Sequence, residues 1–482
     1  MRSKLFKDLS ASSAQVLVNQ LLGLLVFVIT SYYLDKSVYG EFNWSLAVLT
    51  FVTTLLSLRL EQVVVKKIAA GEDASKLLSV LCGHVFVSGV LFYLCLLAGS
   101  FLFPSFFTRH SLLLLLAVSQ VLSFFSMPFK QLATGKEKYR WLAVMSCAGN
   151  LVRSVFLVSV VLFASLTVQQ VIWVYIVSSV AELLLSVYLV QKHLKVPMAG
   201  WSSGDYLSLI RESVPQIGVV FLNACIARID WILLGFFSTQ VITAEYSFAY
   251  KVFELSPVPL LIIGPLLLTR FSAWFGKQPT GVSERQKKTA FLIRMEMILA
   301  TFFPLLLNII WSPFVDALTQ NKYGAVNQLV FFLLSAAIPF QYLINVFWSM
   351  HFAQNRLKMI FRTTFITACI IVCGDLLMIP MLGGKGAAAA YLVAMVVECI
   401  MYGNRISFVG NRDKWLPLVF CISIALLSGG FALLLNVPIF VKVAAAAAVY
   451  VALLFASKQL QRADLVFLKR WLFPVTAKYK PV

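Results

Sequence analysis

The chain has 482 residues, of which 60% are hydrophobic and only 12% are charged, and its net charge is +20. Water-soluble domains carry about 45–50% apolar and about 25% charged residues, so this composition excludes an ordinary soluble fold. The positive charge does not indicate a nucleic-acid partner, because the basic residues lie in short loops between apolar runs and form no basic segment.

Apolar runs of about 20 residues, the length that crosses a bilayer core of about 30 Å, recur along the chain. They predict an all-α, polytopic membrane protein of about fourteen transmembrane helices. In chain order, the predicted spans are 10–34, 39–60, 77–101, 111–129, 141–163, 168–190, 213–235, 242–269, 289–311, 326–352, 359–380, 386–404, 415–436 and 438–456.

Lys and Arg residues gather at alternate ends of these spans. Most of the 40 lie on the side of the N-terminus. The opposite side holds Lys36, Arg109, Lys322, Lys385 and Lys442. Because basic residues favour the cytoplasmic side of a membrane, we expect both termini in the cytoplasm. A misplaced span would have reversed every later loop, so the alternation also supports the number of spans.

Two halves of the sequence resemble each other. Residues 39–45 follow the first span and residues 243–249 follow the seventh, and each segment carries a glutamate (Glu41 and Glu245) at the outer start of the next span. Repeated halves are common in transporters. The repeat predicts two six-helix lobes and two appended helices. The predicted segments are a lobe at 1–195, a lobe at 205–410, two additional transmembrane helices at 411–456 and a basic cytoplasmic tail at 457–482.

These motifs carry a family resemblance. The sequence YGEF at 39–42, and residues 229–236 followed by 244–251, resemble the O-antigen-type polysaccharide flippases of the multidrug/oligosaccharidyl-lipid/polysaccharide exporter superfamily. The likeness runs over about residues 5–455. It implies two lobes around a central cavity, alternating access, and transport of undecaprenyl-pyrophosphate-linked oligosaccharide to the outer leaflet of a bacterial inner membrane.

The first span bears on the substrate class. Lipid II flippases belong to the same superfamily and use arginines in this span. Here the span offers Gln15, Asn19 and Gln20 and no arginine, which counts against a lipid II role.

Four basic residues fall inside predicted spans, namely Arg153, Arg228, Lys251 and Arg294. A charge at mid-bilayer costs about 2.5–3.5 kcal/mol, so it normally faces a partner or a wet cavity. The resemblance implies a pyrophosphate, which arginine binds through two hydrogen bonds at once. We therefore predict that Arg153, Arg228 and Lys251 bind the substrate. Arg294 lies near a helix end, from which it is expected to extend to the surface.

Acidic residues in the spans are candidates for binding a coupling H⁺ or Na⁺. These candidates are Glu182, Asp230, Glu254, Asp375 and Glu398. Asp230 is the first choice, because it lies beside Arg228 in the family-like segment. The alternative is that Glu182, Asp230 and Glu254 only pair with the three cations, and Lys251 and Glu254 have the i,i+3 spacing of a local ion pair.

No catalytic residue, cofactor or metal site is predicted, and we expect no enzymatic activity. The sequence has no Gly-rich phosphate loop, and Cys369 and Cys373 share a helix face without a histidine nearby. Three other functions stay open. A cation-coupled multidrug extruder would favour an acidic cavity, a membrane-embedded polysaccharide polymerase or ligase would need a sizeable outer loop, and a structural scaffold would not need mid-membrane charges. The expected partners are lipid-linked oligosaccharide and membrane lipids, with other polysaccharide-assembly membrane proteins as a further candidate class.

Overall fold

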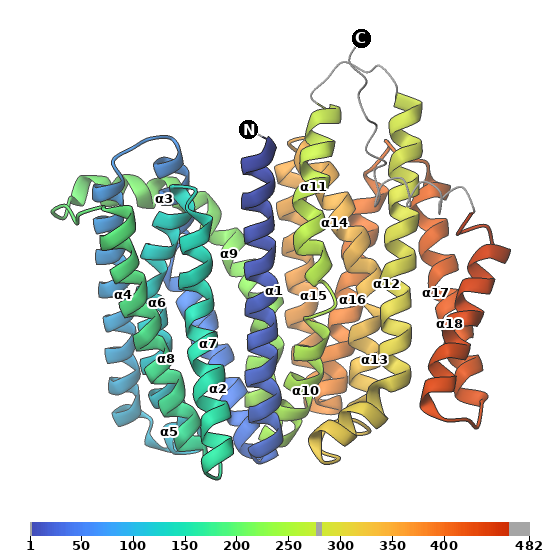
Figure 1. Ribbon diagram of the computed structural model, residues 1–482, viewed down its shortest axis with the longest axis horizontal. Coiled ribbons are helices and arrows are strands. Elements are labelled where there is room, and N and C mark those ends of the chain that lie inside the picture. Colours follow the sequence, from blue (N-terminus) through green and yellow to red (C-terminus); the bar gives the residue numbers. More distant parts are fainter. Residues whose placement is uncertain (1, 276–281, 462–482) are drawn as a thin grey trace. The chain divides into compact units, whose positions relative to one another are not determined.

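The computed structural model describes residues 2–275 and 282–461, and the regular structure in these ranges is entirely helical (Figure 1). The first helices are α1 (Arg2–Tyr33), α2 (Lys36–Leu56), α3 (Leu60–Ala69), α4 (Ala74–Leu102), α5 (Pro104–Arg109), α6 (Leu112–Gly135), α7 (Tyr139–Phe163), α8 (Val168–Leu189), the π-helical turn η1 (Val190–Leu194) and α9 (Ser203–Phe237). The others are α10 (Gln240–Phe253), α11 (Val258–Phe275), α12 (Val282–Thr319), α13 (Gln328–Ala336), α14 (Ile338–Ala353), α15 (Leu357–Leu382), α16 (Gly384–Asn404), α17 (Asn411–Leu434) and α18 (Ile439–Ala456). Most of the predicted basic tail lies outside the described residues.

The predicted polytopic membrane fold is confirmed. By length and apolar composition, eleven helical segments among the described residues could each cross a membrane, and α2 with α3 would make a twelfth. The two remaining predicted spans correspond to α1, whose described apolar part is Leu17–Tyr33, and to α10 followed by α11.

The second predicted span, 39–60, corresponds to α2, which is followed after a break by the short helix α3. The axes of α2 and α3 differ by 51°. Leu58 and Arg59, between the two helices, have left-handed backbone angles (φ of 48° and 61°). His84 of α4 is hydrogen-bonded through Nε2 to the Leu56 carbonyl at 2.8 Å, which satisfies a backbone group that the break leaves without an intrahelical partner. The break is therefore supported by a side chain from a neighbouring helix.

The chain divides into two compact units. The first comprises Met1–Leu255, Leu318–Val330 and Thr364–Ala394, and the second comprises Ser256–Ala317, Phe331–Thr363 and Met395–Val482. The division into two six-helix lobes stays a prediction.

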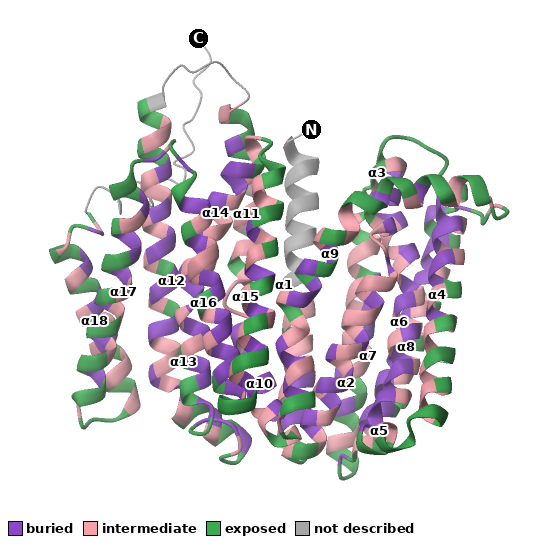
Figure 2. Cartoon of the chain, turned by 180° about the vertical axis from the view of Figure 1, so that it is seen from behind, coloured by how far each residue is buried: buried purple, intermediate pink, exposed green. Residues whose placement is uncertain are grey.

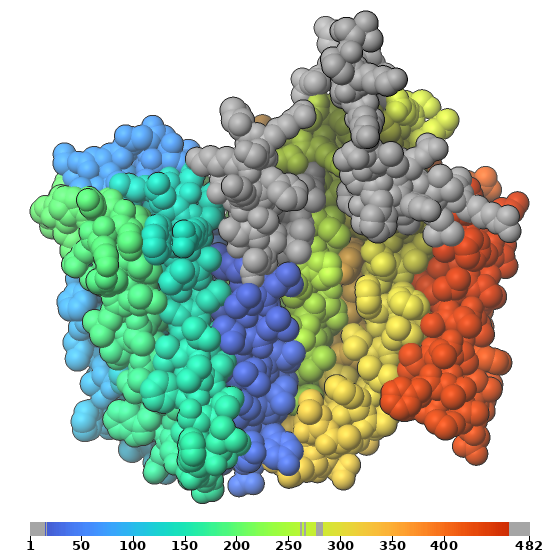
Figure 3. Space-filling view, in the orientation of Figure 1, coloured from blue at the N-terminus to red at the C-terminus, as the bar shows by residue number. Residues whose placement is uncertain are grey.

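In the first unit, α2 packs against α1, α6, α9 and α10. Helix α1 runs along α7, and α7 runs along α8 (Figures 1 and 3). Helix α6 lies against both α4 and α8. In its most apolar stretch 56% of the residues are buried, against 11% for α4, and Figure 2 shows the buried residues along α6. Thus α6 belongs to the core, while α4 directs side chains such as Phe86 and Leu91 outward, as expected for a lipid-facing helix.

Helices α2 and α10 approach each other very closely. A Cβ atom at Gly40 would overlap the backbone carbonyl of Gln240, so only glycine fits at this position of α2 without a shift of α10. This contact fixes the distance between two helices that both carry residues of the candidate site.

In the second unit, α11 packs on α14 and α17 packs on α18. Trp311 stacks on Phe331, with 3.8 Å between the ring centroids. The buried Lys414 donates to the carbonyls of Gly403 and Ile406 at 2.8 and 2.7 Å. Lys414 therefore links α17 to the end of α16.

Candidate functional site

A cavity of about 390 Å³ lies inside the first unit. Side chains from α1, α2, α6, α7, α8, α9 and α10 line it. The three predicted cations, Arg153, Arg228 and Lys251, are all among the lining residues. Glu254 is the one carboxylate among the described residues that line it. The fold thus brings charges from distant parts of the sequence into one space.

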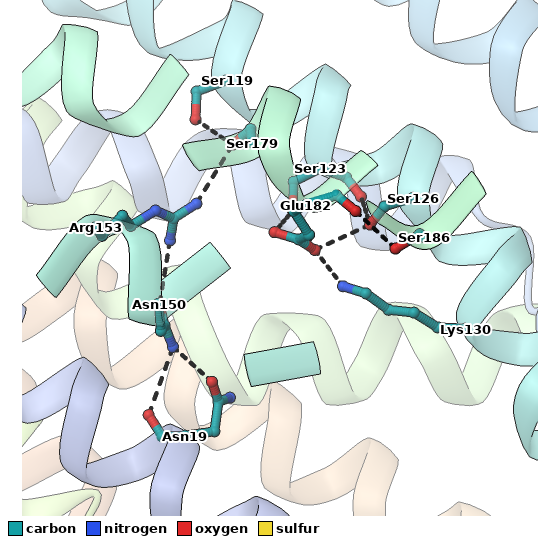
Figure 4. Close-up of polar contacts among 10 residues, drawn as sticks. All are labelled: Asn19, Ser119, Ser123, Ser126, Lys130, Asn150, Arg153, Ser179, Glu182 and Ser186. Atoms are coloured by element: carbon teal, nitrogen blue, oxygen red, sulfur yellow. Dashed lines mark hydrogen bonds and ion pairs between the residues drawn. The ribbon is translucent and has the colours of Figure 1, made fainter. Parts of the chain in front are cut away.

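Arg153 on α7 is held by an aromatic ring and by neutral polar groups. Its guanidinium lies over the Tyr175 ring, 4.3 Å from the centroid, a favourable cation–π arrangement. Its Nη1 donates to Asn150 Oδ1 and its Nη2 donates to Ser179 Oγ, both at 3.4 Å (Figure 4). No carboxylate of the described residues forms an ion pair with it. Its positive charge is therefore available to an anion in the cavity.

Arg228, Lys251 and Glu254 form an ion cluster on another wall. Thr239 accepts a hydrogen bond from the Ile242 amide and starts α10 two residues after α9 ends, which places the two helices side by side. Arg228 Nη1 donates to Glu254 Oε1 at 3.1 Å, and Lys251 Nζ donates to Glu254 Oε2 at 2.7 Å. The i,i+3 ion pair expected from the sequence is present.

Asp230 lies outside the cavity and does not pair with Arg228. Its side chain is buried, with Oδ1 accepting from the Trp231 amide at 2.8 Å and Oδ2 accepting from the Tyr246 hydroxyl at 2.5 Å. Asp375 on α15 is fully buried within electrostatic reach of Asp230. Neither oxygen of Asp375 has a hydrogen-bond partner among the described residues. The two carboxylates form a separate acidic cluster in the first unit.

Glu182 pairs with Lys130, a residue that the sequence did not single out as its partner. Lys130 Nζ donates to Glu182 Oε1, and the Ser126 hydroxyl donates to the same oxygen at 3.0 Å (Figure 4). A Cβ atom at Gly149 of α7 would overlap the carboxylate, so the glycine leaves room for it. Glu182 therefore ties α8 to α6 and does not line the cavity. Glu398, the last candidate, lies half-buried on α16 in the second unit.

Comparison with protein families gives a match to polysaccharide biosynthesis protein over residues 5–267, more than half of the chain. The chain belongs to this family. No curated protein matches it in sequence.

Solved structures share the fold of this polysaccharide biosynthesis protein. The lipid II flippase MurJ in an inward closed conformation is 12% identical with a TM-score of 0.72, covering 96% of this chain and 99% of that one. An inward-facing multidrug resistance MATE transporter is 14% identical with a TM-score of 0.62, covering 85% and 95%. The Vibrio cholerae MATE transporter VcmN in the bent form is 12% identical with a TM-score of 0.54, covering 88% and 98%. The resemblance to polysaccharide-assembly proteins found in the sequence is confirmed by the family match, and the solved structures show that the fold is shared.

The neutral lining of the cavity is the part of the site that sequence reasoning missed. Asn150 Nδ2 donates to Asn19 Oδ1 at 2.8 Å (Figure 4), and Gln120 Nε2 donates to Thr53 Oγ1 at 3.1 Å. Asn43 also lines the cavity. These residues could have been recognised in the sequence as side-chain amides inside apolar spans, because a polar group within the membrane needs a partner or a wet cavity.

Proposed function

We propose that this protein is a flippase that moves undecaprenyl-pyrophosphate-linked oligosaccharide across a bacterial inner membrane by alternating access. The observation that carries this proposal is the convergence of Arg153, Arg228 and Lys251 on one cavity within a membrane protein of the polysaccharide biosynthesis family. Both termini lie in the cytoplasm in this proposal, as the distribution of Lys and Arg indicates.

The charge of the cavity suits a pyrophosphate. Three cations and the Glu254 carboxylate leave a net charge of two positive units among the lining residues. A pyrophosphate diester brings about two negative charges, and unpaired charge in a medium of low dielectric is strongly unfavourable. A cationic drug would meet repulsion here, because the one carboxylate is already bound by two cations. The lining therefore favours the flippase over the multidrug extruder.

The neutral side chains suit a sugar. Amides such as Asn43, Asn150 and Gln120 offer both donors and acceptors, which is the pattern that sugar hydroxyls require. On α1 the lining residues Asn19 and Gln20 are amides and not cations. This lining supports a lipid-linked oligosaccharide as substrate and gives no first-span arginine for lipid II.

Contacts at one end of the cavity helices support alternating access. At the end predicted to face outward, Lys36 forms an ion pair with Glu245 at 2.8 Å, and Asn327 donates to the Glu245 carbonyl at 2.8 Å. Lys322, between α12 and α13, donates to the Tyr32 carbonyl at 2.6 Å. These contacts tie α1, α2 and α10 together, so in our proposal they belong to a state closed toward the outside.

We further propose that an H⁺ or Na⁺ gradient drives transport as an antiport, with Asp230 and Asp375 binding the ion. Two buried carboxylates within electrostatic reach of each other repel when both are ionised, so a bound cation stabilises them. Glu182 suits this role less well, because Lys130 already neutralises it.

Reconstitution tests the proposed function. The purified protein in liposomes is given a fluorescent undecaprenyl-pyrophosphate oligosaccharide and, separately, a cationic drug. Movement of the lipid-linked sugar between leaflets without drug efflux supports the flippase. Drug efflux without sugar movement would contradict it and favour the extruder.

A further inference from the structure

The two oxygens of the Glu254 carboxylate hold two different cations. Oε1 accepts from Arg228 and Oε2 accepts from Lys251, at 3.1 and 2.7 Å. The side chains of Arg228, Lys251 and Glu254 keep 23%, 40% and 27% of their surface exposed, and all three line the cavity. The ion cluster is therefore reached by whatever enters the cavity.

This arrangement resembles the binding of a phosphate. Two oxygens of one phosphate group are likewise bound by an arginine and a lysine, and the phosphate competes for the same N–H donors. The Arg228 guanidinium also lies over the Trp231 ring, 5.1 Å from its centroid, which restricts its orientation. Arg228 thus keeps its place, while the Glu254 carboxylate, at the end of a flexible side chain, can turn aside.

We propose that Glu254 is an internal counter-anion, which in the empty cavity occupies the position that a ligand phosphate would take. It thereby sets a charge threshold, because a ligand displaces it favourably only when the ligand brings more than one negative charge. The proposal rests on the function proposed above. A bilayer presents monoanionic phosphodiester lipids in large excess over any pyrophosphate lipid. When a monoanionic phosphodiester displaces the carboxylate, the cations exchange one negative charge for another, so little binding free energy is gained. A pyrophosphate instead places a second negative charge near the cations.

The charges in the cavity are consistent with this role. When Glu254 turns aside it stays within the cavity, so three cations, one carboxylate and a pyrophosphate of about two negative charges sum to about zero. With a monoanionic lipid, one positive charge stays uncompensated. Glu254 therefore acts as a specificity-determining residue, favouring ligands with two phosphates over ordinary membrane lipids.

Binding measurements on the full-length protein in detergent test the proposal. The probes are undecaprenyl pyrophosphate and phosphatidylglycerol. We expect the wild type to prefer the pyrophosphate, and Glu254→Gln to bind phosphatidylglycerol about tenfold more tightly, with a smaller gain for the pyrophosphate. The preference between the two lipids then shrinks. A purely structural role would instead weaken the binding of both lipids.

A matched control is Glu72→Gln, which removes a carboxylate from the Lys67 ion pair outside the cavity and should leave the preference unchanged. Should Glu254→Gln not be recovered folded, Glu254→Ala tests the same point, because it likewise removes the carboxylate charge from the cavity. Unchanged or weaker phosphatidylglycerol binding in the folded variant overturns the charge threshold.

Failure of the underlying function would look different. In that case the wild type would not bind undecaprenyl pyrophosphate, or Arg228→Gln would bind it as tightly as the wild type. Normal pyrophosphate binding that depends on Arg228, combined with an unaltered preference in the Glu254 variants, would overturn the charge threshold alone.

Discussion

Arg153 lies in the cavity with only neutral partners, so its substitution should affect ligand binding more than folding. We predict that Arg153→Gln lowers transport of lipid-linked oligosaccharide about tenfold, since a charge-assisted hydrogen bond and a stacked cation are each worth about 1–2 kcal/mol. Arg153→Lys should recover part of the activity, because an ammonium keeps the charge but loses the planar fork that stacks on Tyr175. Proteoliposome flipping assays measure both variants.

The control for this prediction is Arg294→Gln on α12, because Arg294 does not line the cavity. This variant should flip substrate at close to the wild-type rate. Wild-type flipping by both Arg153→Gln and Arg228→Gln would show that the cavity cations do not serve transport.

A second prediction at this scale concerns coupling. Asp230→Asn and Asp375→Asn should each reduce transport at normal membrane expression, because each removes a charge that the coupling ion needs. Wild-type transport should respond to a protonophore or to removal of sodium, and the variants should not. The measurement is initial flipping rate with and without the imposed gradient. Variants that respond to the gradient as the wild type does would remove these carboxylates from the mechanism.

Sequence reasoning found the charged residues of the site but few of their partners. The sequence identified Arg153, Arg228 and Lys251 because a charge inside an apolar run is costly whichever direction its side chain faces. Their partners depend on which helices lie side by side, and only the local pair of Lys251 and Glu254 could be read from spacing. Lys130 on α6 pairs with Glu182 on α8, and no spacing along the chain indicates a pair between two separate helices.

At the scale of helices, the approach of α2 to α10 gives a prediction about stability. Gly40→Ala should destabilise the protein by about 1–3 kcal/mol, because the added methyl overlaps the Gln240 carbonyl and the backbone must shift. Gly204→Ala in α9 is the matched control, since no atom lies within 4 Å of the position of its added Cβ. Thermal unfolding in detergent compares the two. Equal stability of both variants would mean that α10 moves aside freely.

Two breaks between helices show which part of the helix boundaries can be predicted from the sequence. The span predicted at 242–269 is divided between α10 and α11, and Pro257 lies in the break, where proline restricts the backbone before it. That signal was available in the sequence. The break after Leu56 has no Gly or Pro and depends on left-handed angles at Leu58 and Arg59 together with a hydrogen bond from His84. Such a break is set by tertiary packing and is not readable from local residues.

At the scale of the whole molecule, the alternation of basic loops predicts the orientation in the membrane. Reporter fusions at Lys136, Arg285 and Arg412 should lie in the cytoplasm. Fusions at Arg109, Thr239 and Lys322 should lie outside. A reproducible inversion at one of these positions would contradict the fourteen-span topology, because every later loop would change sides with it.

The first unit is assembled from three separate stretches of chain, and this has a consequence for biosynthesis. The cavity wall is complete in sequence once Leu255 has left the ribosome. Asn327, which holds Glu245, and Asp375, which lies near Asp230, are synthesised later. At about 5–20 residues per second, a nascent chain carries the cavity-lining charges for several seconds before its acidic cluster exists. An early-terminated product would thus hold the cavity-lining residues without Asp375, one of the two carboxylates proposed to bind the coupling ion.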